Sequence, residues 1–315
     1  MEKIIDPVDV RLIKQELTSD KLLRKTNKAN NELYIFTAQE APNTMREIGR
    51  LREIAFRTAG GGTGLSCDID KYDTMDNPYK QLIVWNPDAE EIIGGYRYIH
   101  GSRAQLDDMG QPLLATAHMF HFSEKFIQDF LPYTLELGRS FVRIEYQSTL
   151  AGNKGLFALD NLWDGLGALT VTKPNTRYFF GKVTMYTTFD AEARNLILYF
   201  INKHFPDKDN LIRPYHPLEI GMDETKLAKI LVEDGYKEDY KILNSIVREK
   251  GFNIPPLINA YMGLSSTMRC FGTSINDEFG DVEETGLLVT VSEISENKYE
   301  RHIQTYLDAV AAEKN

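Results

Sequence analysis

Hydrophobic residues recur along this chain with two different periods, one typical of helices and one typical of strands. After Asn43, the apolar residues Met45, Ile48 and Leu51 stand three apart, which predicts a helix with one buried face. Mostly apolar runs bounded by turn-forming residues predict strands instead. The strands that we expect span residues 32–38, 81–85, 91–99, 133–143, 178–187, 268–275 and 286–294.

Capping residues mark where the predicted helices begin. Asp6 followed by Pro7 is typical of a helix start, and Ser123 and Asp190 are residue types that cap helices well. The helices that we expect span residues 6–17, 43–59, 123–130, 154–169 and 190–204, with two more that begin at 255 and 297. Helices alternate with strands, so the predicted fold class is α/β.

The segment 207–250 interrupts this alternation. It is polar with helical spacing, and it contains no further strand of the preceding kind. We interpret it as a helical insertion. The expected organisation is a helical lead-in at 1–30, a core at 31–206, the insertion at 207–250, and the C-terminal part of the same domain at 251–315.

The charge of the chain narrows the classes of partner. Acidic residues outnumber basic ones by 46 to 36, the net charge is -10, and basic residues form no long run, which argues against nucleic acid. The longest apolar stretches are far shorter than the roughly 20 residues that span a bilayer. The N-terminus lacks the apolar core of a signal peptide, so a cytoplasmic location is expected.

The cysteines and histidines predict no metal centre and no disulfide. Cys67 and Cys270 stand far apart without neighbouring thiols at metal-ligand spacing. His118 and His121 are three apart among aromatic residues, which we interpret as core packing because no third ligand is near. Trp163 is expected in the core as well.

Five short motifs follow one another between residues 50 and 169. They are LREIAFR, DIDKYD, IIGGYR, ELGRSFV and LDNLW. In this order they resemble the ornithine-lipid and glycine-lipid N-acyltransferases, often labelled hemolysin-like, and more distantly the acyl-homoserine lactone synthases. The resemblance implies the GNAT acyl-CoA N-acyltransferase fold, a mixed central sheet with two splayed strands and flanking helices.

The resemblance also implies the site residues. The family's polar set corresponds to Arg52, Phe56, Asp70, Asp73, Arg97, Glu136 and Arg139. Glu136, Arg139 and Arg97 are the implied catalytic group, with Glu136 as the candidate base that accepts the proton of the attacking amine. A structural ion pair is the alternative role for Glu136, because nearby arginines lower the pKa of a carboxylate. Arg52, Phe56, Asp70 and Asp73 are implied to contact substrate.

The splayed strands of the family suggest where the acyl donor lies. Backbone amides near Phe141 and Val142 are expected to face the thioester carbonyl, as an oxyanion hole requires. The amides of Lys154 and Gly155, at the start of a predicted helix, are expected to meet the donor's phosphate. Lys173 and Arg177 are candidates for docking an acidic carrier protein, although surface lysines are more often only solvated.

Two departures from the family refine the expected reaction. Residues 60–64 are glycine-rich where the lactone synthases carry a tryptophan, which argues against lactone formation. We interpret these residues as a flexible loop, since no helix follows to bind a phosphate. The stretch 147–155 does not fit the pyrophosphate-binding loop of coenzyme A-dependent GNAT enzymes, so acyl carrier protein is favoured as the donor.

The expected function is transfer of a long-chain, 3-hydroxylated fatty acyl group from acyl carrier protein to the amine of an amino acid. Glycine and ornithine are the acceptors that the resemblance implies, and the product is an N-acyl amino acid lipid precursor. No permanently bound cofactor is expected, because the acyl-phosphopantetheine thioester is a co-substrate. A peripheral contact with the inner membrane fits such a product. The alternatives are a coenzyme A-dependent small-molecule acetyltransferase and a non-catalytic acyl-binding protein.

Overall fold

The computed structural model describes residues 1–147, 155, 157–221, 224–232 and 235–313. The strands are β1 Leu22–Lys25, β2 Glu32–Phe36, β3 Lys80–Asn86, β4 Glu91–His100, β5 Phe120–Phe122, β6 Thr134–Val142, β7 Tyr178–Met185, β8 Ile212–Pro214, β9 Arg269–Asn276 and β10 Val282–Thr290. The helices are α1 Val10–Glu16, α2 Pro42–Ala59, α3 Lys71–Thr74, α4 Ala158–Thr172, α5 Ala191–His204, α6 Glu224–Ile230, α7 Tyr236–Glu249, α8 Pro256–Met262, α9 Glu296–Tyr299 and α10 Thr305–Glu313.

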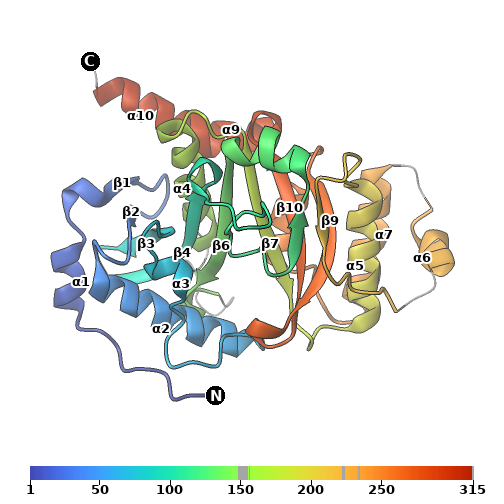
Figure 1. Cartoon of the computed structure of the whole chain (residues 1–315), viewed down its shortest axis with the longest axis horizontal. Coiled ribbons are helices and arrows are strands. Elements are labelled where there is room, and N and C mark those ends of the chain that lie inside the picture. Colours follow the sequence, from blue (N-terminus) through green and yellow to red (C-terminus); the bar gives the residue numbers. More distant parts are fainter. Residues whose placement is uncertain (148–154, 156, 222–223, 233–234, 314–315) are drawn as a thin grey trace.

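Eight of these strands form one mixed sheet in the order β1-β2-β3-β4-β6-β7-β10-β9. Every neighbouring pair is antiparallel except β6 and β7, which run parallel. Figure 1 shows α1 at the β1 end of the sheet and α5, α6 and α7 at the β9 end. The α/β class and the mixed sheet flanked by helices are confirmed.

Apolar side chains cover both faces of this sheet. On one face, α2 buries Met45, Ile48 and Leu51 against β2 and β3. On the other face, α4 buries Leu162 and Leu166, in a cluster that continues through α5, α7 and α8. Trp163 belongs to that cluster and contacts Tyr261, as expected for a core residue.

The N-terminal helix begins later than the sequence predicted. Asp9, not Asp6, is its N-cap, because the Asp9 carboxylate accepts a hydrogen bond from the Arg11 amide at 2.9 Å. At the next two predicted caps the interpretation was right. Ser123 Oγ accepts from the Phe126 amide, and Asp190 accepts from the Ala193 amide.

Several short elements were missed by the pattern of the sequence. The segment 207–250 contains the strand β8, which pairs with β5 in a separate two-stranded sheet, so the expectation of helices alone was wrong. His121 lies on β5, and its ring contacts Tyr215 rather than the core. Strand β1 and the single-turn helix α3 were also missed.

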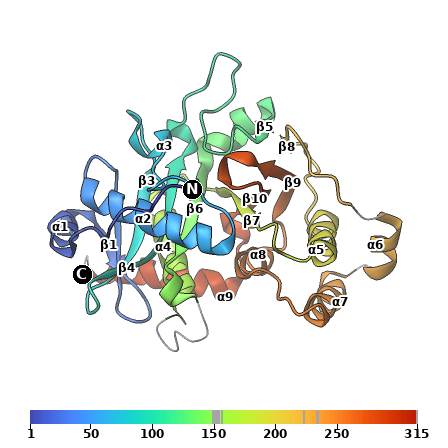
Figure 2. The same ribbon diagram turned by 90° about the horizontal axis from the view of Figure 1, so that it is seen from below.

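The loop that follows β4 projects away from the sheet (Figure 2). Leu106, Met109 and Leu113 are exposed along it, and Met109 has 86% of its surface exposed. The loop returns to the sheet through Ala115 and Thr116, which line the cavity described below. No helix among the described residues is long and apolar enough to cross a membrane.

Candidate active site

Strands β6 and β7 separate halfway along their length. They are paired from Thr134 and Tyr178 as far as Leu137 and Gly181, and β6 then continues to Val142 beside β4 alone. The splayed pair that the resemblance implied is therefore present.

A β-bulge stands at the point of separation. Arg97 faces Gly138 and Gly95 faces Phe141, so Arg139 and Ser140 together oppose the single residue Tyr96. Arg139 has a φ of 48°, a left-handed conformation that costs a non-glycine residue about 1–3 kcal/mol. The bulge turns the Arg139 side chain out of the regular alternation of the strand.

Beyond the bulge, one backbone amide of β6 points into the opening between β6 and β7. The Arg143 amide donates to the Ile93 carbonyl at 2.8 Å. Hydrogen-bonded positions alternate in an antiparallel ladder, so Phe141 pairs toward β4 and the Val142 amide points into the opening. Of the two amides predicted to face the oxyanion, the Val142 amide has the suitable direction and the Phe141 amide does not. The Phe141 side chain is buried in the core.

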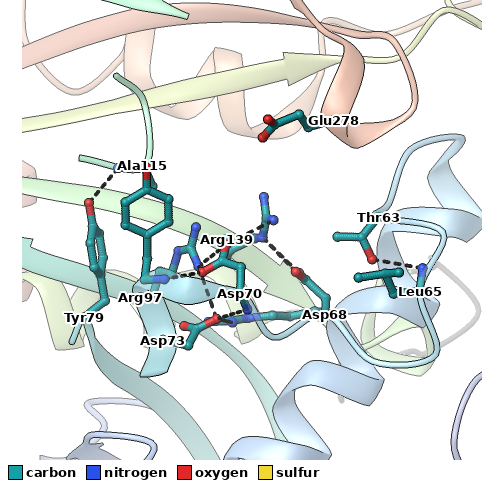
Figure 3. A network of polar contacts seen from close by, with 12 residues as sticks. Thr63, Leu65, Asp68, Asp70, Asp73, Tyr79, Arg97, Ala115, Arg139 and Glu278 are labelled. Carbon is teal, nitrogen blue, oxygen red and sulfur yellow. Dashed lines mark hydrogen bonds and ion pairs between the residues drawn. The ribbon is translucent and has the colours of Figure 1, made fainter. Parts of the chain in front are cut away.

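Three arginines and three aspartates form a buried ion network beside the bulge (Figure 3). Arg97 Nη1 lies 2.7 Å from Asp70 and 3.2 Å from Asp73. The network is completed by Arg52, 3.5 Å from Asp73, and by Arg139, whose Nε lies 2.9 Å from Asp68. The motif residues that the sequence singled out thus meet in space.

Local structure explains how two of the three aspartates of the DIDKYD motif, Asp70 and Asp73, reach Arg97. Asp70 caps the single turn of α3 by accepting from the Tyr72 amide, and the Asp73 carboxylate accepts from the Asp70 amide. This capping box presents both carboxylates on the same side. Asp73 and Arg52 have no exposed surface, so they form the floor of the site rather than a contact surface for substrate.

The pKa directions agree with a paired network. Burial alone would lower the pKa of Arg97, but Asp73 and Asp70 raise it above the usual value. Burial alone would raise the pKa of Asp73, but Arg52 and Arg97 lower it. Both groups are therefore charged near neutral pH.

Glu136 is held by hydroxyl and amide groups rather than by an ion pair with Arg139. Its Oε1 accepts from the Thr116 amide at 3.1 Å and from the Thr116 hydroxyl at 2.7 Å, and its Oε2 accepts from the Tyr79 hydroxyl. Burial raises the pKa of Glu136, and these hydrogen bonds offset part of that rise. A carboxyl with a raised pKa is better suited to accept a proton from an amine.

A first cavity of about 420 Å³ connects Glu136 with the network. Four predicted residues line it, namely Asp70, Arg97, Glu136 and Arg139. The sequence interpretation missed Thr63, Leu65, Tyr72, Tyr79, Thr116, His118, Lys182, Asn276 and Glu278, which also line it. His118 is exposed and its Nε2 lies 3.3 Å from Asn276, so its assignment to core packing was wrong.

The glycine-rich segment 60–64 contributes to this cavity through Thr63. Glu53, which has no exposed surface, accepts from the amide and hydroxyl of Thr63 and from the Gly64 amide. The loop is thus fastened to α2 by three hydrogen bonds, which the interpretation as a flexible loop did not anticipate.

A second cavity of about 200 Å³ passes between β6 and β7. Phe56 lines it from α2, and Tyr96 and Tyr261 line it from the opposite side, where they belong to the core cluster around α4 and α8. The two cavities share Leu137, Gly138, Arg139, Lys182 and Phe279. A continuous cleft therefore crosses the sheet where the strands separate.

The Tyr96 hydroxyl is a buried polar group at the second cavity. It has 2% of its surface exposed, and no well-formed hydrogen bond joins the hydroxyl to a residue that the structure describes. Burial raises its pKa, and the neighbouring Ser140 hydroxyl opposes that rise. A buried hydroxyl of this kind is a natural contact for a bound molecule.

Lys182 lies where the two cavities meet, and the sequence did not predict it as a site residue. Its ammonium contacts Glu284 of β10, and its side chain is 12% exposed. Burial lowers the pKa of Lys182, and Glu284 offsets part of that effect. One signal was available in the sequence, since Lys182 is the only charged residue of the strand YFFGKVTM.

Of the two predicted donor-phosphate residues, Gly155 is described, and it lines neither cavity. Lys154 lies outside the described residues, and Gly155 precedes α4, where its carbonyl accepts from the Ala158 amide at 3.3 Å. Arg177 stacks on the Tyr133 ring at 4.2 Å, and Lys173 is the C-cap of α4. Their roles in binding a donor stay predictions.

The splayed strands, the bulge and the shared cleft define a GNAT-type acyltransferase, and a comparison with protein families agrees. The family model described as an acetyltransferase (GNAT) domain matches residues 51–153. The chain is 64% identical to a glycine N(alpha)-acyltransferase of Phocaeicola vulgatus over 307 residues, 98% of this chain and 94% of that protein. A glycine N(alpha)-acyltransferase of Bacteroides thetaiotaomicron is 64% identical over 309 residues, 98% of this chain and 92% of that protein. The chain belongs to this family of GNAT N-acyltransferases.

Proposed function

We propose that this N-acyltransferase moves a long-chain, 3-hydroxylated fatty acyl group from acyl carrier protein to the amine of glycine. The observation that carries the proposal is the cleft, whose two cavities meet at Gly138, Arg139 and Lys182. One cavity is polar and lies beside Glu136, whereas the other is lined mainly by aromatic and aliphatic side chains. This division suits a small charged acceptor and an acyl thioester.

The first cavity provides what a zwitterionic amino acid requires. Arg139 and Lys182 supply positive charge on its walls, and Glu136 and Asp70 supply carboxylates. Glycine is favoured over ornithine because the relatives are glycine N(alpha)-acyltransferases. Ornithine is the second acceptor to be tested.

The second cavity would hold the donor. The free edge of β6 beyond Leu137 can pair with the extended phosphopantetheine arm, as unpaired strand edges pair with peptides. The Val142 amide then points toward the thioester carbonyl and stabilises the negative charge that develops on its oxygen. A carrier protein is favoured over coenzyme A because the sequence lacks the family's pyrophosphate-binding loop.

The reaction follows from these positions. The ammonium group loses one proton to Glu136, and the nitrogen then attacks the thioester carbon, so that a C–N bond forms. The nitrogen of the tetrahedral intermediate loses a second proton as the C–S bond breaks, and the leaving thiolate of the phosphopantetheine arm takes up this proton. The products are the N-acyl amino acid and the free carrier thiol.

An in vitro assay tests the proposal. Purified protein is given a 3-hydroxypalmitoyl carrier protein and an equimolar mixture of glycine and ornithine, and the products are identified by mass spectrometry. We expect N-acylglycine as the main product, with slower turnover when the coenzyme A thioester replaces the carrier. Absence of any N-acyl amino acid would overturn the proposal.

We also propose that the enzyme works at the surface of the inner membrane from the cytoplasmic side. The exposed Leu106, Met109 and Leu113 lie on the loop whose base lines the first cavity. Flotation with phospholipid vesicles tests this contact. Serine substitutions at Leu106 and Met109 should lower the bound fraction, and equal binding of the wild type and the variant would refute it.

A further inference from the structure

Lys182 stands where the two substrates of the proposed reaction would meet. It lies on β7, one residue beyond the last pair that joins β7 to β6, Leu137 with Gly181. Its side chain lines both cavities. A positive charge at this position faces the acceptor cavity and lies close to the opening through which the donor passes.

Each guanidinium of the network is already paired with an aspartate. Arg97 donates to both oxygens of Asp70 and to Asp73, and the Arg139 Nε donates to Asp68. Among the residues that the structure describes, the Lys182 ammonium contacts one carboxylate, that of Glu284. An ammonium has three N–H donors, so two remain for a ligand in the cavity.

Glu284 fixes the position of this ammonium. It has no exposed surface, and its second oxygen accepts from the Thr184 hydroxyl at 3.2 Å. Asn276 Nδ2 lies 3.4 Å from the same oxygen that binds Lys182. A buried, hydrogen-bonded carboxylate of this kind holds a lysine in place without filling its remaining donors.

Strand register relates Lys182 to the candidate base. Glu136 pairs with Phe180, and paired residues of neighbouring strands project to the same face of a sheet. Lys182 is two residues beyond Phe180, so it shares that face with Glu136 and lies diagonally across from it. Both side chains line the first cavity, so a small molecule bound there can contact Glu136 with an amine at one end and Lys182 with a carboxylate at the other.

We propose that the Lys182 ammonium binds the carboxylate of the amino acid acceptor and so directs its amine toward Glu136. The inference rests on the proposed function, and it makes Lys182 a positioning residue that determines acceptor specificity. An amine without a carboxylate cannot make this contact. The enzyme should therefore distinguish glycine from glycinamide chiefly through Lys182.

The test compares these two acceptors with wild type and Lys182→Met, which keeps a long side chain without the charge. In the wild type we expect a clear preference for glycine. In the variant, kcat/KM for glycine should fall at least tenfold, mainly through a higher KM, while kcat/KM for glycinamide changes less than twofold. If Lys182 had a purely structural role, its substitution would lower kcat/KM equally for both acceptors.

A second variant covers the case in which Lys182→Met does not fold. Removing one partner leaves Glu284 as an unpaired buried charge, whereas Lys182→Met with Glu284→Gln removes both charges. The double variant should fold and show the same loss of preference. Arg194→Met with Glu283→Gln is the matched control, because that ion pair involves the neighbouring residue of β10 and lines neither cavity. The control should keep the wild-type preference.

The outcomes separate this inference from the proposed function. If the wild type acylates glycine but the preference for glycine over glycinamide survives in both Lys182 variants, Lys182 does not bind the carboxylate. An equal loss for both acceptors would likewise overturn the inference. If the wild type acylates no amino acid, the proposed function itself fails.

Discussion

The guanidinium of Arg139 lies 2.9 Å from the carboxylate of Asp68, and Arg139 makes this contact from a left-handed backbone. Asp68 has no exposed surface, so the pair is buried on one side and meets the cleft on the other. The ring of Phe279, 4.4 Å from the guanidinium, packs against the same side chain. These contacts compensate for the strained conformation and fix the charge at the edge of both cavities.

Loss of this ion pair should destabilise the fold and also lower the activity. Arg139→Ala leaves Asp68 as an unpaired buried charge, and we expect a cost of about 3 kcal/mol in the free energy of unfolding. Urea denaturation measures it. Adding Asp68→Asn should recover part of the loss, and strictly additive effects of the two substitutions would contradict a direct interaction.

Glu136→Gln should lower turnover at least tenfold, while the melting temperature near neutral pH should be no lower than that of the wild type. Glutamine can still accept from Thr116, but it cannot take up the proton of the amine. The measurement is the rate of N-acylglycine formation beside a thermal melt. Unchanged turnover would remove Glu136 as the base.

Because the pKa of Glu136 is raised, the stability of the protein and the rate of the reaction should depend on pH in opposite directions. Folding favours the protonated form, so its contribution to stability is complete below the ordinary pKa of 4.5 and is lost as pH rises through the raised value. The rate should instead increase over that same rise. Melting temperatures across a pH series should show Glu136→Gln gaining on the wild type as pH increases.

Tyr96→Phe should make the protein more stable but its use of the acyl donor less efficient. The Tyr96 hydroxyl is buried without a well-formed hydrogen bond to a described residue, so its removal should stabilise the protein by about 1 kcal/mol. If the donor occupies the second cavity, the same change should raise the KM for the acyl donor. Tyr98→Phe is the control, since Tyr98 is buried on the same face of β4 but lines neither cavity. A loss of stability in Tyr96→Phe would refute the unpartnered hydroxyl.

Gly94→Ala should disturb the strand pair that carries the bulge. A Cβ at Gly94 would lie 2.4 Å from the Phe141 carbonyl, and this backbone atom cannot move without separating β4 from β6. We expect a loss of about 1–3 kcal/mol in the free energy of unfolding, together with lower activity. Gly221→Ala, where a Cβ would meet no atom of a described residue within 4 Å, should be neutral.

The sequence predicted the long elements because their signals are local. The spacing of Met45, Ile48 and Leu51 and the turn between β3 and β4 depend only on neighbouring residues. The ordered motifs placed Arg52, Asp70, Asp73, Arg97 and Arg139 in one site. Short elements such as β1 and β8 carry too few residues for a periodic pattern.

The contacts of the site depended on geometry that periodicity does not contain. Regular alternation cannot reveal that Arg139 adopts a positive φ or that the bulge redirects its side chain. Tyr79 and Thr116 reach Glu136 from 57 and 20 residues away in the chain, through a turn and a long loop. Lys182 depends on the pairing of β7 with β10, which only the folded sheet establishes.

The cleft that crosses the sheet also constrains how a product departs. In the proposed reaction the acyl chain arrives on one side of the opening and the amino acid on the other, and the new amide bond joins them through it. When the amide bond has formed, the product therefore extends through the opening, with one part on each side of the sheet. One half must be drawn back past Arg139 and Lys182 before the next cycle, so escape of the lipid, rather than bond formation, is the step that this architecture slows.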